Sequence, residues 1–217
     1  PYRKLPLFGV HCPAVHTVHD VLDLTEPLYR MRPRVFFDRY RLHKALQRAD
    51  LTWYVSRWSM QETGSLAGAV GKNPRVRHSG IDDRFTDAVQ DADSSVLHKH
   101  GLEAGYILVL GNGLPHKNLG VLLEISARLA RRLVFVGVSQ RNRRFWDARH
   151  PNSPAVWIEH ADDEDMPPLL RHAFCLSQPS LAEGYGFPPL EAMACGTPAV
   201  VSNIAVLVET TGGSALA

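Results

Sequence analysis

The sequence predicts an α/β fold in which helices cover parallel sheets. Short apolar runs, such as 106–110 and 133–136, alternate with amphipathic stretches of helical spacing. Polar or glycine-rich loops follow several of these runs, as they do where strands of a parallel sheet lead into helices. A polar, acidic stretch at 82–95 interrupts the alternation. We therefore expect two domains of the same class, residues 1–82 and 83–217.

The first predicted domain contains three short strands and two helices. Strands are expected at 14–18, 51–55 and 74–77, and helices at 34–48 and around 59–66. The first strand runs into His19 and Asp20, which places these two polar residues at its carboxyl end. Ser56 follows the second strand and is a residue type that begins helices well.

The second predicted domain continues the alternation with more elements. Strands are expected at 106–110, 133–136, 156–158, 174–178 and 199–202, and helices at 95–100, 118–131, 166–172 and 188–195. The last helix has proline at its start and Gly196 just past its end. We assign Arg141, Arg143 and Arg144 to a solvated loop, and His98 and His100 to the surface.

Composition excludes several classes of protein. The 217 residues carry 24 Lys and Arg against 22 Asp and Glu, a balance too even to indicate a nucleic-acid partner or a membrane-surface footprint. The three cysteines, Cys12, Cys175 and Cys195, form no C-x-x-C pair, which favours a reducing compartment and argues against disulfides or zinc. No apolar run approaches the roughly 20 residues of a spanning helix. We expect a cytoplasmic location, including the inner face of the membrane.

The loop after the 106–110 strand has features of an anion site. It reads GNGLPHKNL at 111–119, and Gly111 and Gly113 allow a ligand to approach the backbone. Lys117 stands near the start of the next helix, where a cation is unfavourable by about 0.3–1 kcal/mol, so its position suggests an anionic partner. The dinucleotide and P-loop glycine patterns both fail here. A glycine-rich connector with a solvent-facing lysine is the alternative.

The loop and helix at 179–198 hold two acidic residues, Glu183 and Glu191, with seven residues between them. Gly184 and Gly186 flank Tyr185 and open backbone amides toward a ligand. Glu191 is expected in the first helical turn, where a carboxylate is favoured by the dipole and can act as a cap. A carboxylate at this place could also accept hydrogen bonds from the two hydroxyls of a ribose.

These motifs resemble those of the retaining family-4 glycosyltransferases. Residues 183–203 read EGYGFPPLEAMACGTPAVVSN, close to the pattern E-G-[FY]-G-x-P-x-L-E-A-M-A-C-G-T-P followed by a strand and S-N. Three further segments are similar to motifs of that family: HTVHD at 16–20, SGIDDRF at 79–85 and HKNL at 116–119. The resemblance implies the GT-B fold, which consists of two Rossmann-like domains with parallel sheets facing a cleft, and a nucleotide-diphosphate-sugar donor.

The resemblance also implies a role for each motif residue. Glu191 would hold the donor ribose and Lys117 the pyrophosphate, beside Gly111, Asn112 and Gly113. Glu183 and the amides of four residues would hold the donor sugar: Gly184, Tyr185, Gly186 and Phe187. His19 would reach the reaction centre from the first domain. The acceptor would be a glycan or lipid-linked glycan, with peripheral membrane association, and neither a metal nor another cofactor would be required.

Two departures from the family pattern bear on activity. Many relatives have an arginine where this chain has Asn112, so neutralisation of the phosphates would depend more on Lys117. The first part of the N-terminal domain, with its glycine-rich first loop, and the closing C-terminal helices have no counterpart in these residues. We therefore expect residues 1–217 alone to bind nucleotide weakly and to transfer no sugar at a measurable rate.

Three other functions compete with sugar transfer. A nucleotide-sugar epimerase can share the two-domain fold, and a non-catalytic nucleotide-sugar-binding fragment would keep the same loops. A glycosidase would use Glu183 and Glu191 as a catalytic pair, but retaining hydrolases need carboxyls about 5–5.5 Å apart, and that reaction gives no role to Lys117. His16 and His19 are three residues apart on a predicted strand. Their side chains therefore point to opposite faces of the sheet and cannot bind one metal ion together.

Overall fold

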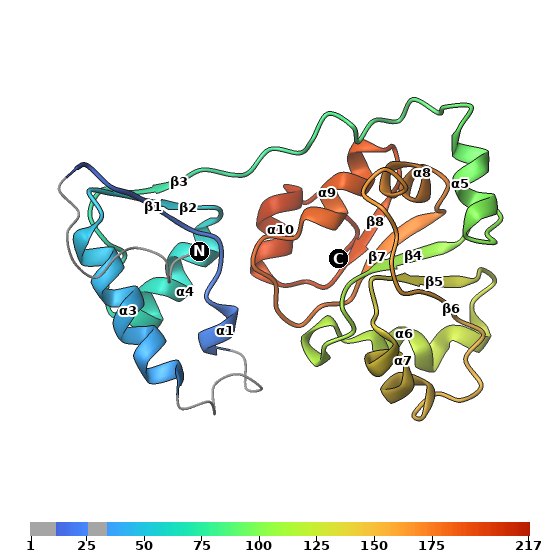
Figure 1. Cartoon of the computed structure of the whole chain (residues 1–217), viewed down its shortest axis with the longest axis horizontal. Coiled ribbons are helices and arrows are strands. Elements are labelled where there is room, and N and C mark those ends of the chain that lie inside the picture. The colour runs from blue at the N-terminus through green and yellow to red at the C-terminus, as the bar shows by residue number, and fades with distance from the viewer. Residues whose placement is uncertain (1–11, 26–33) are drawn as a thin grey trace. The chain divides into compact units, whose positions relative to one another are not determined.

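The computed structural model describes residues 12–25 and 34–217, which group by their contacts into two compact units (Figure 1). The first unit contains Pro1–Gly80 and two later segments, Ala182–Gly186 and Ala205–Thr210, and the second contains the rest. The domain boundary expected between residues 82 and 83 stays a prediction. The sequence did not anticipate that two later segments would group with the first unit.

The first unit is built on a parallel three-stranded sheet. Its strands are β1 (Val15–Val18), β2 (Leu51–Tyr54) and β3 (Pro74–Val76), in the spatial order β1-β2-β3. Helices α1 (Leu22–Thr25), α3 (Arg34–Arg48) and α4 (Arg57–Ala67) connect them, and α10 (Ala205–Thr211) contributes most of its residues to this unit. The predicted strands and helices occur in the predicted order and α3 has the predicted bounds, but α1 and α10 were not predicted.

The core of the first unit joins this sheet to its helices. Val18 and Tyr54 from the sheet pack with Leu24 of α1 and with Leu42 and Leu46 of α3. The phenol oxygen of Tyr54 donates to a backbone carbonyl at 2.9 Å, which satisfies the one polar atom of this buried ring. Helix α4 follows immediately from β2 through a capping box at its first residues.

The second unit is a five-stranded parallel sheet with β4 at its centre. The strands are β4 (Ile107–Leu110), β5 (Leu133–Val136), β6 (Val156–Ile158), β7 (Cys175–Gln178) and β8 (Ala199–Val201). Their spatial order is β6-β5-β4-β7-β8. The chain moves outward from β4 to β6 and then returns to build β7 and β8 on the other side. Such a reversal opens a crevice at the carboxyl ends of the central strands, where ligands bind in folds of this class.

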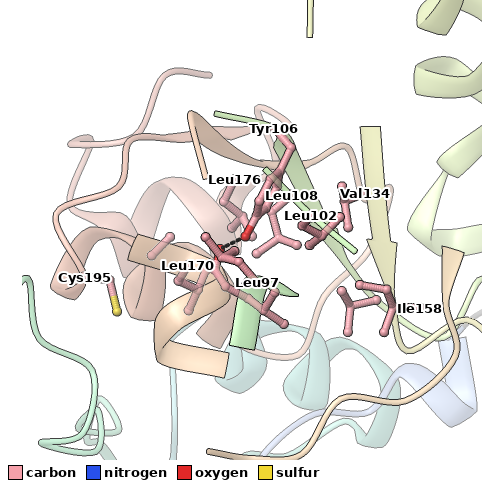
Figure 2. Close-up of a cluster of buried hydrophobic side chains, with 12 residues drawn as sticks. Leu97, Leu102, Tyr106, Leu108, Val134, Ile158, Leu170, Leu176 and Cys195 are labelled. Carbon is pink, nitrogen blue, oxygen red and sulfur yellow. Dashed lines mark hydrogen bonds between the residues drawn. The ribbon is translucent and has the colours of Figure 1, made fainter. Parts of the chain in front are cut away.

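Helices cover both faces of this sheet. On one face lie α5 (Asp93–Lys99), α8 (Met166–Arg171) and α9 (Phe187–Ala194), and on the other α6 (Leu119–Ile125) and α7 (Gln140–Asp147). Leu108 points into the first core, drawn in Figure 2, and its neighbour Val109 into the second. In the first core the hydroxyl of Tyr106 donates to the Leu169 carbonyl at 2.7 Å. The central strands β4 and β5 are therefore covered on both faces, as their continuous apolar sequences predict.

A buried ion pair joins α5 to α8. Arg171 donates to both carboxylate oxygens of Asp93, at 2.7 and 2.8 Å, and its side chain and that of Asp93 are almost fully buried. A third nitrogen-to-oxygen contact, from Arg171 to the carbonyl of Thr86 at 3.1 Å, uses another guanidinium donor. The arginine lowers the pKa of Asp93 and keeps its carboxylate charged.

Several local predictions were wrong. Arg141, Arg143 and Arg144 lie in α7, not in a loop, because Ser139 caps a helix whose Trp146 is buried. His100 is not a surface residue: its ring is mostly buried and lies 2.8 Å from a carboxylate oxygen of Asp165. The helix predicted over 118–131 ends at Ile125 and continues only as a single 3₁₀ turn over Ser126–Arg128. Within residues 12–25 and 34–217, no helix is long and apolar enough to cross a membrane.

Candidate functional site

The loop after β4 carries Lys117 across the backbone of Gly111. The chain forms a 3₁₀ turn over Pro115–Lys117 and then enters α6. A Cβ atom built on Gly111 would lie 3.3 Å from Cδ of Lys117, so the stem of the lysine passes close over this glycine. A Cβ on Gly113, where φ is +73°, would lie 2.8 Å from the side chain of Val138. Both positions therefore need glycine for close packing.

Helix α7 holds this loop in place. The side-chain amide of Asn142 donates to the carbonyl of Asn112 at 2.6 Å, and the indole N–H of Trp146 donates to the carbonyl of Gly113 at 3.0 Å. Asn112 also accepts a hydrogen bond from the amide of Leu114 at 3.1 Å. Sequence reasoning missed Asn142 and Trp146 because it placed their segment in a loop. Asn112 therefore shapes the loop, while Lys117 is the cation of this segment.

The two predicted loops meet at the carboxyl edge of the second unit's sheet. The amide of Leu181 donates to the carbonyl of His116 at 2.7 Å, which joins the loop after β7 to the loop after β4. Strands β4 and β7 are neighbours and parallel, so their carboxyl ends open at the same edge. This is the place where the reversal of strand order leaves room for a ligand.

Glu191 lies farther along α9 than predicted. The helix begins at Phe187, so Glu191 is in its second turn, and the first turn contains no acidic residue. A capping role for Glu191 is therefore wrong. Its side chain is partly buried, and among the described residues no hydrogen bond reaches its carboxylate. Burial raises the pKa of Glu191, and the positive charge of Arg84 opposes this rise.

The segment 182–186 belongs to the first unit and packs closely there. Glu183 and Tyr185 are each only 7% exposed. A Cβ on Gly184 would lie 2.8 Å from Cβ of Asp20, and one on Gly186 would lie 2.4 Å from Leu207 of α10. Gly186 also has φ +93°, which favours glycine. These contacts hold Glu183 in a segment with little room for any added side chain.

His19 stands at the carboxyl end of β1, beside this segment. Its side chain is exposed, while His16, three residues earlier on the strand, is 4% exposed. The next residue, Asp20, accepts from the amide of Leu22 at 3.0 Å and is the residue against which Gly184 packs. The structure thus brings the His19–Asp20 turn together with the Glu183 segment in the first unit. Lys117 and Glu191 lie in the second unit.

A hollow of about 230 Å³ lies elsewhere in the second unit. Tyr106, Arg131 and Arg132 are among its lining residues, at the amino ends of β4 and β5. Ligands of parallel α/β sheets bind at the carboxyl ends, and none of the predicted site residues lines this hollow. We therefore place the candidate site at the loop that carries Lys117 and at helix α9, which carries Glu191. The described residues contain no group of three His, Cys, Asp or Glu side chains that could hold a metal ion.

Comparison with known proteins identifies the family. The profile of the family described as glycosyl transferases group 1 matches residues 95–212, more than half of the chain. The chain belongs to the group 1 glycosyl transferases. The matched region of this group 1 chain includes both loops, with Lys117 and Glu191. Its α/β fold with parallel sheets is that of GT-B glycosyltransferases.

Curated relatives of this group 1 chain include bacterial mannosyltransferases. It is 30% identical to the O-antigen chain mannosyltransferase B of Escherichia coli, over 94% of this chain and 56% of that protein. It is 24% identical to the O-antigen chain mannosyltransferase RfbU of Salmonella typhimurium, over 99% of this chain and 62% of that protein. The chain thus spans less than two thirds of the length of these relatives.

Solved structures share the fold at lower sequence identity. WaaG, a glycosyltransferase involved in lipopolysaccharide biosynthesis, is 16% identical with a TM-score of 0.73, over 93% of this chain and 60% of that one. HepE of Anabaena, solved in complex with UDP and glucose, is 18% identical with a TM-score of 0.72, over 91% of this chain and 54% of that one. At this level of identity the likeness establishes the fold of the group 1 chain and not its ligands.

Proposed function

We propose that this chain carries the donor-binding part of a retaining family-4 glycosyltransferase. The reaction would move a hexose from a nucleotide-diphosphate-sugar to a hydroxyl of a glycan or lipid-linked glycan. The observation that carries the proposal is Glu191: a partly buried carboxylate that no hydrogen bond from the described residues reaches, on the helix that follows the loop joined to the Lys117 loop by the bond from Leu181 to His116. Desolvating a carboxylate without a partner costs free energy, and a ligand with hydroxyl donors would offset that cost.

The donor nucleotide would bind in the second unit. Glu191 would accept hydrogen bonds from the two ribose hydroxyls, and Lys117 would face the diphosphate. Gly111 and Gly113 would allow the phosphates to approach the backbone, since a side chain at either place would crowd its neighbours. Asn112 keeps the loop in shape through its turn and its contact with α7. The site would need no metal and no separate cofactor.

The donor sugar would meet Glu183 and the amides that follow it. Glu183 begins the segment that continues through Gly184, Tyr185 and Gly186 to Phe187 at the start of α9. Because Gly184 packs against Asp20, this segment lies beside the turn that carries His19. His19 would act at the reaction centre, and its exposed side chain leaves it accessible to a ligand.

Transfer with retention would break the bond between the anomeric carbon and the diphosphate oxygen. The nucleoside diphosphate would leave with the bonding electron pair, and an acceptor oxygen would bond to the same carbon on the same face and pass its proton to the leaving diphosphate. Lys117 and the backbone amides would stabilise the charge that develops on the leaving group, as preorganised donors do in other enzymes. The names of the relatives suggest mannose as the sugar and a growing O-antigen-type polysaccharide as the acceptor.

Helix α3 supports the proposed peripheral association with a membrane surface. Phe36 is 84% exposed, and Phe37 and Tyr40 are about half exposed on the same helix. The cationic groups of Arg41 and Lys44 each lie 5.7 Å from an aromatic ring centroid. Exposed aromatic residues among basic ones are typical of helices that bind anionic lipid surfaces. In a flotation assay, the protein should move upward with anionic vesicles and not with neutral ones. Phe36→Ser should reduce the fraction of protein that floats with the anionic vesicles.

A ligand panel tests the proposed function directly. GDP-, UDP- and ADP-sugars are added in thermal-shift experiments, because a donor at 100 times its dissociation constant should stabilise the fold by about 2.7 kcal/mol. Transfer is then measured with glycan acceptors by product NMR, in a protein extended to the length of the mannosyltransferase relatives. We expect a product of retained anomeric configuration from the extended protein and no transfer from residues 1–217. An inverted product would contradict retention.

Two other results would contradict the proposal, and a third would contradict only the expectation that residues 1–217 alone are inactive. Conversion of the donor sugar without any acceptor would indicate an epimerase. Binding without conversion in the extended protein would indicate a non-catalytic nucleotide-sugar-binding protein. Transfer by residues 1–217 alone would show that the acceptor site lies inside these residues.

A further inference from the structure

Glu209 of α10 binds the start of another helix. Its Oε1 accepts from the amide of Arg57 at 2.6 Å, and its Oε2 accepts from the amide of Trp58 at 3.0 Å. These are the first two amides of α4, which have no partner within their own helix. A carboxylate at a helix start is also favoured by the helix dipole. Glu209 therefore joins two helices through residues that are 151 and 152 positions apart in the sequence.

The same carboxylate also contacts His78. Oε1 of Glu209 lies 3.0 Å from the ring nitrogen Nε2 of His78, and the side chain of Glu209 is only 15% exposed. Burial by itself raises the pKa of Glu209. Hydrogen bonds from the amide of Arg57, from His78 and from the amide of Trp58 together lower the pKa by more than burial raises it. The net effect is a lowered pKa, so the carboxylate is charged where it meets these donors. Hydrogen bonds to a charged acceptor are stronger than neutral ones.

The contacts of Glu209 continue into the segment that carries Glu183. Ser79, next to His78, accepts a hydrogen bond from the hydroxyl of Tyr185 at 3.0 Å, and the His78 and Tyr185 rings lie 6.3 Å apart between centroids. Tyr185 is two residues after Glu183. One charged side chain thus connects, through His78 and Ser79, to the segment expected to hold the donor sugar.

The Glu183 segment needs such support because its own sequence is flexible. Gly184 and Gly186 flank Tyr185, and glycine restricts the backbone less than any other residue. Packing fixes the two glycines, one against Asp20 and the other against Leu207 of α10. Binding groups must be held within about 0.5 Å of their productive positions by the residues around them. The Tyr185 ring is the one large side chain of this segment, so its anchoring decides where Glu183 lies.

We propose that Glu209 is a positioning residue that holds the Glu183 segment, through His78, Ser79 and Tyr185, in the conformation that binds the donor sugar. The inference rests on the proposed function, which places the sugar at Glu183. In this arrangement Glu209 touches neither donor nor acceptor. It fixes the start of α4 and the His78–Ser79 segment that follows β3, and the hydroxyl of Tyr185 then has a fixed acceptor.

Two variants and a control separate positioning from general stability. Glu209→Gln keeps the shape but replaces one acceptor oxygen with an NH₂ group that faces an amide donor. Tyr185→Phe keeps the ring and removes only the bond to Ser79. Glu124→Gln is the matched control, because Glu124 is exposed and is not among the proposed binding residues. Hydrogen exchange is measured at 57–60 and 182–186, and affinities for a nucleotide-sugar and its nucleoside diphosphate are measured by calorimetry.

Glu209→Gln should speed exchange at both segments, and Tyr185→Phe only at 182–186. Both should weaken the nucleotide-sugar roughly tenfold and leave the nucleoside diphosphate within about twofold of wild type. Unchanged exchange at 182–186 in both variants would overturn the inference, as would equal losses of affinity for the two ligands. Hydrogen exchange is measured without ligand. If wild type binds no nucleotide, the proposed function is refuted, and the exchange rates at 182–186 still show whether Glu209 holds that segment.

Discussion

Replacing Glu191 by glutamine should weaken nucleotide binding and also stabilise the ligand-free protein. Burial raises the pKa of Glu191 above its ordinary value near 4.5, which means that the folded state disfavours the charged carboxylate. Above the raised pKa, the charged carboxylate therefore destabilises the folded state, and a neutral glutamine does not. This cost is absent below the ordinary value and reaches its full size once the pH exceeds the folded pKa. The variant should gain stability over wild type in that upper range.

The affinity that Glu191→Gln should lose can be estimated from the hydrogen bonds that the Glu191 carboxylate would accept. Within the described residues no hydrogen bond occupies its carboxylate, so both oxygens are available to the ribose hydroxyls. Hydrogen bonds to a charged group contribute about 1.5–3 kcal/mol, against about 0.5–1.5 kcal/mol for neutral partners. Exchanging a charged acceptor for a neutral one should therefore cost about 1–3 kcal/mol, or about 5- to 150-fold in affinity.

Calorimetry with a nucleoside diphosphate measures the affinity, and thermal or urea unfolding without ligand measures the stability. Glu124→Gln removes an exposed carboxylate and serves as the control for the change of net charge. At a ligand concentration 100 times the wild-type dissociation constant, wild type should gain about 2.7 kcal/mol and a tenfold weaker variant about 1.4 kcal/mol. If Glu191→Gln binds the nucleotide as tightly as wild type, Glu191 is a packing residue of α9 and the ribose lies elsewhere.

Three further variants test other parts of the chain. Lys117→Ala should weaken a nucleoside diphosphate far more than a nucleoside, measured by calorimetry; equal losses would mean that the lysine only shapes its loop. His19→Ala, in the protein extended to the length of the relatives, should lower the rate of transfer with little change in donor affinity, and full activity would remove it from the site. Asp93→Asn should cost about 3–5 kcal/mol in urea unfolding, because it leaves the buried Arg171 unpaired. Since the pKa of Asp93 is lowered, the wild-type advantage should be present at neutral pH and disappear as the pH falls below the ordinary range of an aspartate; equal stability at neutral pH would contradict this.

Strands and loops were readable from the sequence because buried parallel strands are continuous apolar runs. The strands over 133–136 and 156–158 have the predicted bounds, and the loops after β4 and β7 lie at the carboxyl edge as expected. Helix α10 was not predicted. Its sequence, AVLVETT, is rich in β-branched residues, which disfavour helices, and burial of Val206 and Leu207 outweighs that preference.

The residues of the candidate site could be predicted from the sequence, but their contacts and positions in space could not. The glycines and charged residues of the two loops stand out in the sequence, but nothing in it indicates that Leu181 bonds to His116. Glu191 falls in the second turn and not the first because α9 begins at Phe187, one residue earlier than predicted. Glu209 could not be found at all, since its partners are backbone amides far away in the chain.

The assignment of 182–186 and 205–210 to the first unit bears on how the chain folds during synthesis. Residues 1–80 contain the strands and the apolar core of that unit, so this core can begin to form early. The first two amides of α4 then lack their acceptor until Glu209 has emerged from the ribosome, about 150 residues later. At roughly 5–20 residues per second this interval lasts on the order of ten seconds. A protein cut at residue 80 or 181 would keep that exposed helix start permanently, and such pieces should be poor starting points for isolating either unit.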